Sequence, residues 1–367
     1  MNYPLVSAVI LNFNGKKNLP DILPRCLFSV LCSDYPNLEV IFFDNGSTDG
    51  SVEFVKQKFQ SNAKLKIVAI HNNCGPGAGY NKAIEYTRGK YVIILNNDVE
   101  LESDSIQELV SAMESDSAIG IAHSKIMFFD RLHIQSVGNL LDMNFSTVSI
   151  GNNEEDQGQY DSAFEPTFPP GACMILRRSM IEMIGLFDPN YFFYHDDIDV
   201  GLRARIAGFK VMYVPSSIAY HVEGGTMSGY TEKNGLNYYS LISRLGLFIK
   251  NFEFKSILKN GIPMLVSYFL AISIFLKNGD IALIFKTFFW TISNFKNDWK
   301  SRQFIQHRIR RIPDSELFEY FIDYTLFLSG IRMTPPFKWI FGRHGSSAKS
   351  LKGLTDAYYR NHKVTLN

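Results

Sequence analysis

The first 125 residues alternate between short apolar runs and stretches of helical character. Apolar runs rich in β-branched or aromatic residues lie at 5–11, 38–43, 65–70 and 91–95. Helix-like stretches lie between and after them, at about 19–33, 50–60, 80–88 and 103–114. Continuously apolar strands that are separated by helices are typical of a mostly parallel sheet covered on both faces. The pattern therefore predicts an α/β fold for this part of the chain.

The pattern changes twice further along the chain. Residues 125–170 are irregular and polar, which indicates a loop-rich insertion. Beyond about residue 236 the sequence becomes helical and apolar, and its apolar segments at 262–276 and 281–293 are each shorter than the ~20 residues that cross a bilayer. We expect three parts: a body over 1–240, a helical region over 241–342 and a flexible tail over 343–367.

Charge is distributed unevenly between these parts. The net charge of +1 argues against a nucleic-acid binder, and the hydrophobic fraction of 46% excludes global disorder. Residues 1–240 carry 18 Lys/Arg against 28 Asp/Glu, whereas residues 241–311 carry 12 against 3. Basic, apolar helices with many aromatic residues are typical of segments that lie on an anionic bilayer surface. The alternative is that this surface packs on the body or joins copies of the chain in a homo-oligomer.

Cysteine usage and the first residues bear on location. The four cysteines form no C-x-x-C pair, which favours reduced thiols in a cytoplasmic setting. The N-terminal residues lack the basic region and the small-residue cleavage site of a signal peptide. We therefore expect the protein at the cytoplasmic face of the cell membrane.

Polar or glycine-rich loops follow each of the four predicted strands. They cover residues 12–15, 44–49, 71–81 and 96–98. In open α/β sheets the ligand lies in the crevice at the carboxyl ends of the strands. Four such loops at one edge predict a nucleotide-sized ligand, although Asn, Asp and Gly are also ordinary turn formers.

The common nucleotide-binding motifs do not fit these loops. A G-x-G-x-x-G motif that starts at Gly75 needs glycine where Tyr80 stands. The phosphate loop of NTPases needs glycine at Ile84 and Ser or Thr at Tyr91. Dinucleotide-dependent hydride transfer and P-loop hydrolysis are therefore poor fits.

Two aspartates follow predicted strands at the positions where ligands are expected. Asp98 ends a buried strand and offers a hard oxygen ligand to Mg²⁺ or Mn²⁺, which would bridge to a diphosphate. The alternative role is a helix N-cap, for which Ser103 is better placed. The carboxylate of Asp44 can accept a hydrogen bond from a nucleobase N–H, and its alternative role is to stabilise the turn at Asn45-Gly46.

An acidic cluster opens a predicted helix near residue 197. Asp196 and Asp199 have the spacing of an N-cap and N3 pair, which is a structural role. At ideal helical spacing Asp197 points away from both, so we interpret it as a general base for an acceptor hydroxyl. The alternative is that all three carboxylates satisfy the helix N-terminus. His221 follows another strand and is a candidate nitrogen ligand for the metal or, alternatively, a structural histidine.

An ordered set of motifs resembles the family 2 inverting glycosyltransferases, most closely their rhamnosyltransferase-like branch. The matching segments are VSAVILNFNG, FFDNGSTDGS, NCGPGAGYNKAI, LNNDV, the stretch from Gly171 to Pro215 and HVEGGT, which together span about residues 5–240. The resemblance implies a GT-A fold, which is an α/β domain that binds a nucleotide-diphosphate sugar. A helical, apolar and basic region would follow that domain.

The resemblance also implies roles for single residues. The nucleotide-sugar site would include Asn12, Asn14, Asp44, Gly75, Gly79, Asn81 and Asn97, and the metal ligands would be Asp98 and His221. Asp197 matches the catalytic base. Gly171, Ala172 and Asp196 would lie on the acceptor side.

Three departures from the family pattern matter. The metal motif has asparagine at its first two positions, Asn96 and Asn97, and the usual Glu-Asp pair is Asp196-Asp197. The Q-x-x-R-W motif of processive synthases is missing, which indicates transfer of one or a few sugars. We expect a metal-dependent inverting glycosyltransferase with a lipid-linked or other glycan acceptor. The alternatives are a nucleotidyltransferase, which normally has a basic Gly-rich loop after the first strand, and a sugar-nucleotide-binding protein without turnover.

Overall fold

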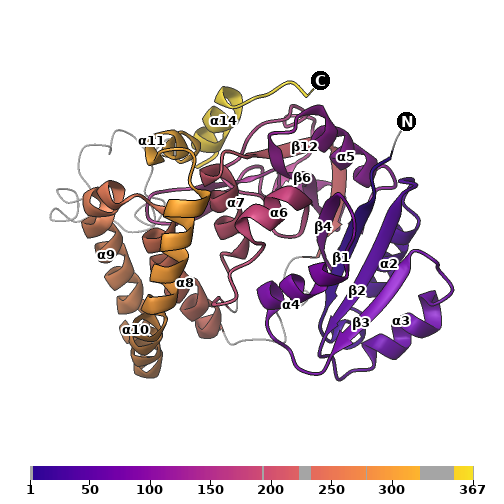
Figure 1. Cartoon of the computed structure of the whole chain (residues 1–367), viewed down its shortest axis with the longest axis horizontal. Helices are drawn as coiled ribbons and strands as arrows, with labels where there is room; N and C mark the ends of the chain where they lie inside the picture. The colour runs from indigo at the N-terminus through magenta and orange to yellow at the C-terminus, as the bar shows by residue number, and fades with distance from the viewer. Residues whose placement is uncertain (1–2, 192–193, 223–232, 278, 323–350, 367) are drawn as a thin grey trace.

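A ten-stranded mixed sheet forms the centre of the molecule (Figure 1). The computed structural model describes residues 3–191, 194–222, 233–277, 279–322 and 351–366. Eight strands follow the order β10-β7-β6-β11-β4-β1-β2-β3, and β12 pairs with β6 and β5. The strands are β1 (Val6–Asn12), β2 (Leu38–Asn45), β3 (Leu65–Ile70), β4 (Tyr91–Asn96), β5 (Val99–Leu101), β6 (Ile119–Phe128), β7 (His133–Ser136), β10 (Glu154–Glu155), β11 (Cys173–Arg177) and β12 (Lys210–His221).

Most strands of this sheet run in one direction. β1 is parallel to β2 and β4, β2 is parallel to β3, and β12 is parallel to β6. β11 is antiparallel to both β4 and β6, so these two neighbours share a direction on either side of it. The predicted α/β fold with a mostly parallel sheet is confirmed.

Helices cover both faces of the sheet (Figure 1). One core contains Ala8 and Ile10 of β1 and residues of α2 (Ile22–Leu31), α3 (Ser51–Phe59) and α5 (Ser105–Ser115). The other contains Val9 of β1 and residues of α4 (Pro76–Ala83), α6 (Arg178–Ile184), α7 (Asp196–Ile206) and α8 (Lys233–Asn251). Alternate side chains of a strand point to opposite faces, so a strand that is buried on both faces is apolar at every position.

The helix α8 belongs to the core of the body. Leu247 and Phe248 of α8, and Phe252 just after it, are buried in the same core as Ile198 of α7. The expected boundary at residue 240 cuts through this helix. The physical reason is that the apolar pattern of α8 resembles that of the helices after it, so sequence alone does not distinguish a buried helix from a peripheral one.

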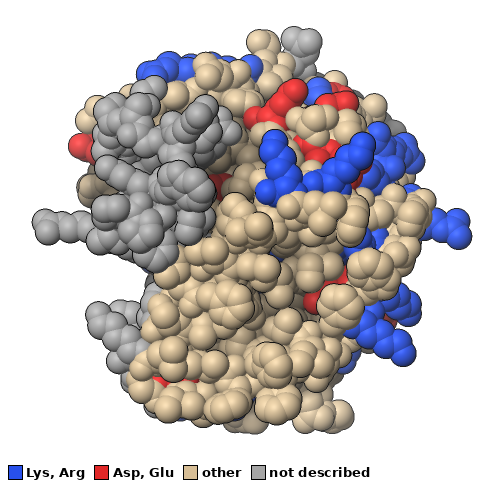
Figure 2. All heavy atoms as spheres, turned by 90° about the vertical axis from the view of Figure 1, so that its left-hand side faces the viewer, with Lys and Arg blue, Asp and Glu red and all other residues tan. Residues whose placement is uncertain are grey.

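The next two helices, α9 (Phe254–Lys277) and α10 (Ile281–Phe304), have a large apolar surface. Fourteen of the seventeen exposed large hydrophobic residues in the described part of the chain lie on them. In Figure 2 apolar and neutral side chains cover this face, and Lys and Arg side chains lie along its margins. Within the described residues, no helix combines the length and hydrophobicity needed to cross a membrane.

The insertion and the tail are more ordered than we expected. Residues 125–170 contain β7, β10 and the two-stranded sheet of β8 (Asn139–Leu141) and β9 (Thr147–Ser149). In the tail, Leu351–Asn361 form α14, whose Tyr359 is buried against Tyr160 and Phe164 of the insertion. The expectation of a flexible tail is therefore wrong for this helix, because its aromatic side chains pack on the body. Residues 343–350 lie outside the described part.

Candidate active site

A cavity of about 650 Å³ opens where the strand ends of the body meet the insertion. Of the residues singled out in the sequence, its walls include Asn97, Gly171, Ala172, Asp196, Asp197 and His221. Polar residues of the insertion, among them Gln135 and Asn139, form another part of the wall. The cavity therefore brings the proposed base and a proposed metal ligand together.

Asp98 and His221 meet at one end of this site. Asp98 lies two residues after the end of β4, and His221, which we expected to follow a strand, is the last residue of β12. Asp98 Oδ1 lies 3.2 Å from His221 Nε2, and the carboxylate is almost completely buried. His221 Nδ1 lies 2.8 Å from Gln135 Oε1. A proton on Nδ1 that is donated to this amide oxygen leaves the lone pair of Nε2 facing Asp98.

This pair has the chemistry of a divalent-cation site. Asp98 Oδ1 is buried and has no hydrogen-bond partner among the described residues, which fits an oxygen that could bind a cation. The described residues contain no group of three His, Cys, Asp or Glu side chains that could hold a metal. Two protein ligands suit Mg²⁺ or Mn²⁺ when other oxygens complete the coordination shell.

The two asparagines before Asp98 have protein partners. Asn96 Oδ1 accepts a hydrogen bond of 3.3 Å from the Tyr80 hydroxyl. Asn97 Nδ2 donates to Asn12 Oδ1 at 2.8 Å. A carboxylate at position 97 could not donate this bond, so the amide has a structural reason to replace the acid of the family pattern.

Asp44 supports the loop after β2. Its Oδ1 accepts hydrogen bonds from Asn12 Nδ2 at 2.8 Å and from the Ser47 hydroxyl at 2.6 Å, and its Oδ2 accepts from the Ser47 N–H at 2.9 Å. The turn role that we weighed as an alternative is therefore present, and the residue is buried. Asn14 joins the same loop, since its Oδ1 accepts from the Thr48 N–H at 2.9 Å.

The glycine-rich loop before α4 approaches the strand ends closely. A Cβ atom at Gly79 would lie 2.9 Å from Leu11 Cδ1, and Gly75 has a φ of +86° that favours glycine. Asn81 forms two hydrogen bonds with the backbone of Phe187. Its Nδ2 donates to the Phe187 carbonyl at 2.8 Å, and its Oδ1 accepts from the Phe187 N–H at 3.0 Å. Asn81 therefore fixes the backbone at Phe187, a role that its place in the motif did not reveal.

Asp197 has the properties of a general base. It lines the cavity, and burial raises its pKa to about 6, although backbone N–H groups, including those of Ile198 and Gly171, oppose the rise. A Cβ atom at Gly171 would lie 3.5 Å from Asp197 Oδ2, an ordinary van der Waals distance, so Gly171 lies directly beside the carboxylate. A base whose pKa lies near neutrality is suited to accept a proton from a hydroxyl.

The predicted N-cap role of Asp196 is wrong. His195, at a φ of +67°, is the N-cap of α7, and its carbonyl accepts the Asp199 N–H at 2.8 Å. Asp196 is the first helical residue, and its Oδ1 is buried without a partner. Burial and then the neighbouring Asp197 hold the pKa of Asp196 well above its usual range. The raised pKa favours the neutral, protonated form of Asp196 over the charged form.

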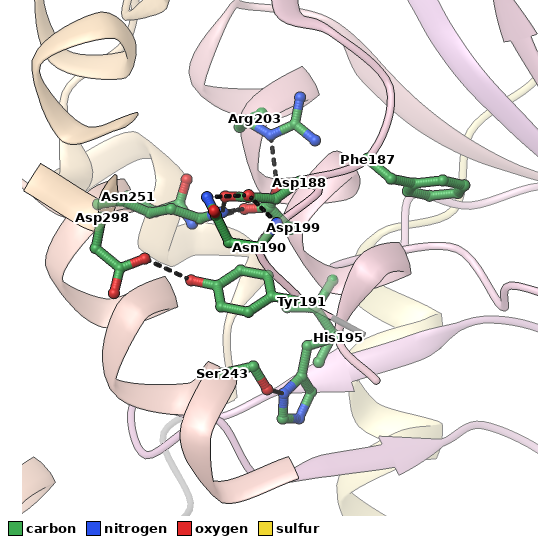
Figure 3. Close-up of polar contacts among 12 residues, drawn as sticks. Phe187, Asp188, Asn190, Tyr191, His195, Asp199, Arg203, Ser243, Asn251 and Asp298 are labelled. Atoms are coloured by element: carbon green, nitrogen blue, oxygen red, sulfur yellow. Dashed lines mark hydrogen bonds and ion pairs between the residues drawn. The ribbon is translucent and has the colours of Figure 1, made fainter. Parts of the chain in front are cut away.

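Sequence reasoning missed the contacts that residues of α8 and α10 make with Asp188, Tyr191, His195 and Asp199 (Figure 3). His195 Nδ1 lies 2.5 Å from Ser243 Oγ, and Tyr191 donates to Asp298 Oδ1 of α10 at 3.1 Å. Lys250 Nζ contacts Asp188 Oδ2 at 2.5 Å and Asp199 Oδ1 at 2.9 Å. These partners lie about 50 to 110 positions apart along the chain, so no local spacing rule could have found them.

Comparison with known proteins agrees with this geometry. Residues 7–185 match the family model described as Glycosyl transferase family 2. An uncharacterized glycosyltransferase of Haemophilus influenzae is 28% identical over 130 residues, which cover 35% of this chain and 50% of that protein. An N-acetylglucosaminyl-diphospho-decaprenol L-rhamnosyltransferase of Mycobacterium tuberculosis is 27% identical over 221 residues, which cover 54% of this chain and 71% of that protein. The chain thus spans half of the first relative's length.

A solved structure shows the same fold. The crystal structure of GalNAc-T7 with UDP, GalNAc and Mn²⁺ aligns with a TM-score of 0.54 at 16% identity, over 67% of this chain and 48% of that chain. The GT-A-like architecture is therefore confirmed, with nucleotide-sugar binding as the shared chemistry of the family. The chain carries a glycosyltransferase domain of family 2.

Proposed function

We propose that this protein is a metal-dependent inverting glycosyltransferase. Asp197 takes the proton from an acceptor hydroxyl, and the oxygen attacks the anomeric carbon of the donor from the face opposite the nucleotide. The bond between that carbon and the diphosphate breaks, and a nucleoside diphosphate leaves. A divalent cation held by Asp98 and His221 would neutralise negative charge on the departing diphosphate.

One observation carries this proposal. The Asp98–His221 contact of 3.2 Å and the buried carboxylate of Asp197, whose pKa is raised to about 6, belong to one site. A cation site supplies the electrostatic stabilisation and a tuned carboxylate supplies the base, and both are needed for inverting transfer. The Mn²⁺ in the structurally similar GalNAc-T7 crystal supports a divalent cation here.

We propose a lipid-linked glycan as the acceptor. The mycobacterial relative is named for an acceptor on a decaprenol diphosphate. The exposed apolar residues of α9 and α10 are accompanied by exposed lysines at 255, 259, 286, 296 and 300, and the only carboxylate of these two helices within the described residues, Asp298, is buried. Such a face fits the surface of an anionic bilayer, with apolar side chains at the acyl boundary and lysines at headgroups.

We propose that the activity takes place at the cytoplasmic side of the cell membrane, where nucleotide sugars are made, and the apolar, lysine-rich face of α9 and α10 supports a membrane surface as the location. The transfer of a hexosyl or deoxyhexosyl unit fits the glycosyltransferase fold and the rhamnosyltransferase relative. The alternative occupant of the apolar face is a second copy of this chain, which the flotation experiment in the Discussion separates from a bilayer.

The experiment that tests the function is a panel of nucleotide-sugar donors. Release of nucleoside diphosphate is measured with and without a prenyl-diphosphate-linked N-acetylglucosamine acceptor, and with Mn²⁺ or EDTA. We expect release from one donor class that depends on both the acceptor and the cation. A protein that binds donors but releases no nucleoside diphosphate under any of these conditions would contradict the proposed transfer.

A further inference from the structure

Arg244 is a largely enclosed cation for which the described residues provide no hydrogen-bond or ion-pair partner. It lies in α8, directly after Ser243, and its Nε and Nη1 atoms are enclosed yet form no hydrogen bond. No ion pair joins it to any carboxylate of the described residues. An enclosed guanidinium without a partner costs several kcal/mol, because it loses its hydration and gains nothing in return. Such a group in a native structure calls for a specific explanation.

The nearest compensating charge does not satisfy Arg244. Burial lowers the pKa of Arg244, and the carboxylate of Asp142 opposes this shift. Asp142 Oδ1, however, already accepts the backbone N–H groups of Asn144 and Ser146, at 2.8 Å and 2.9 Å. Since arginine remains protonated in proteins, the described residues leave this positive charge largely unbalanced.

This charge lies next to the proposed catalytic site. The imidazole of His195 bonds to Ser243, the neighbour of Arg244 on α8, and His195 lines the same cavity as Asp197. Burial and then the charge of Arg244 lower the pKa of His195 to about 3, so this histidine is neutral and adds no charge of its own. Arg244 therefore lies near His195, behind the residues that line the cavity on the side of the base.

We propose that Arg244 binds the diphosphate group of a substrate. This inference rests on the proposed function, which supplies two diphosphates: that of the nucleotide-sugar donor and that of a lipid-linked acceptor. The planar guanidinium presents parallel N–H groups that can donate hydrogen bonds to two phosphate oxygens. The negative charge of the diphosphate would balance the positive charge of Arg244. Binding of the diphosphate would give the guanidinium of Arg244 the hydrogen-bond acceptors that the described residues do not provide.

The first test uses inorganic pyrophosphate and the full chain, without divalent cations. Calorimetry should show that Arg244→Met weakens pyrophosphate binding by about tenfold or more, as expected for lost hydrogen bonds to a charged group. Arg308→Met removes an exposed arginine and should leave the affinity unchanged. Asp98→Ala should also retain binding, because no metal takes part. Equal affinity of wild type and Arg244→Met would overturn the proposal.

Two further ligands identify the source of the diphosphate. Nucleoside diphosphates with Mn²⁺ report on the donor, and farnesyl diphosphate reports on a lipid-linked acceptor. Loss of affinity for only one of them in Arg244→Met assigns the residue to that substrate, and loss for neither contradicts the proposal. These measurements need no turnover, so they stand even if the donor panel shows no sugar transfer.

The melting temperature provides an independent test. If Arg244 has no protein partner, Arg244→Met should melt about 2 °C or more above wild type without ligand, because it removes the cost of an unpaired buried charge. Pyrophosphate should raise the melting temperature of wild type but not of the variant. An Arg244→Met protein that melts lower or fails to fold would show that the arginine is needed within the protein. Arg244→Lys keeps the positive charge but lacks the paired N–H groups of the guanidinium. It should bind pyrophosphate several-fold more weakly than wild type.

Discussion

Lys250 Nζ lies 2.9 Å from Asp199 Oδ1, and through this contact α8 is joined to the helix that carries Asp197. Both side chains are almost completely buried. Asp199 Oδ2 also accepts from Arg203 Nε at 2.8 Å, and Lys250 and Arg203 hold the pKa of Asp199 at about 2. The first turn of α7 is therefore held by charges from two helices, one of which follows the GT-A strands in the sequence.

Replacing Lys250 should destabilise the whole body. Lys250→Met leaves Asp188 and Asp199 buried with one cation fewer, and such a loss of one partner costs about 3–5 kcal/mol. Chemical denaturation measures the free energy of unfolding. The exposed Lys255 on α9 provides the control, because Lys255→Met should change this free energy by about 0.5 kcal/mol or less. A similar small change in both variants would show that the buried contact contributes little.

The raised pKa of Asp197 should make the protein less stable as pH rises. The folded state holds this proton up to about pH 6, whereas the unfolded chain releases it near the ordinary aspartate pKa of 3.8. Folding therefore takes up a proton between these values, and stability falls as pH rises through this window. Asp197→Asn removes the penalty and should be more stable than wild type at pH 7.5 by on the order of 1–3 kcal/mol.

Thermal unfolding at pH 4 and at pH 7.5 checks this relationship. The stability difference between Asp197→Asn and wild type should be largest at pH 7.5 and should shrink towards pH 4. A difference of the same size at both values would mean that the carboxylate does not titrate in this range.

Membrane binding by the apolar face of α9 and α10 is best tested with point substitutions, because truncation near residue 240 would remove most of α8 from the core. Full-length protein should float with phosphatidylglycerol-containing liposomes, and high salt should weaken flotation without abolishing it. Phe285→Glu combined with Phe289→Glu places charge on the exposed face of α10 and should prevent flotation. Leu132→Glu changes an equally exposed apolar residue of the body and should not. A discrete soluble oligomer that never floats would instead identify the face as an interface between copies.

If Asp98 and His221 hold the metal, replacing either residue should cause the same loss of metal-dependent binding. Asp98→Ala and His221→Ala should each abolish the Mn²⁺-dependent part of nucleoside-diphosphate binding, because each removes one of the two protein ligands. Calorimetry with and without Mn²⁺ measures this part. Asp130→Ala, at an exposed aspartate, should retain it. Unchanged Mn²⁺ dependence in Asp98→Ala would remove that residue from the metal site.

The fold could be predicted because burial on both faces leaves a plain sequence signal. Strands such as 91–95 are apolar at every position, and polar loops mark their carboxyl ends. Because the carboxyl ends of parallel strands meet at one edge of a sheet, these loops are expected to converge. Asn12, Asp44 and Asn97 are indeed linked by hydrogen bonds.

Other features could not be predicted because they depend on backbone conformation or on distant partners. The left-handed conformation of His195 makes it the N-cap of α7 in place of Asp196, and no residue spacing indicates it. The contacts of Lys250 and the enclosure of Arg244 arise only when α8 packs on the body. A sequence pattern shows that α8 is amphipathic but not what it covers.

The role of Asp197 as the base is the central claim, and the turnover number of Asp197→Asn beside Asp196→Asn tests it most directly. The asparagine at 197 cannot accept a proton, so kcat should fall by roughly 10²–10⁴ while donor affinity stays nearly unchanged. Asp196→Asn is nearly isosteric and removes no proton acceptor that the proposed mechanism uses, so kcat should stay within about threefold of wild type. An Asp197→Asn protein with wild-type kcat, or an equal loss in both variants, would contradict the assignment of Asp197 as the base.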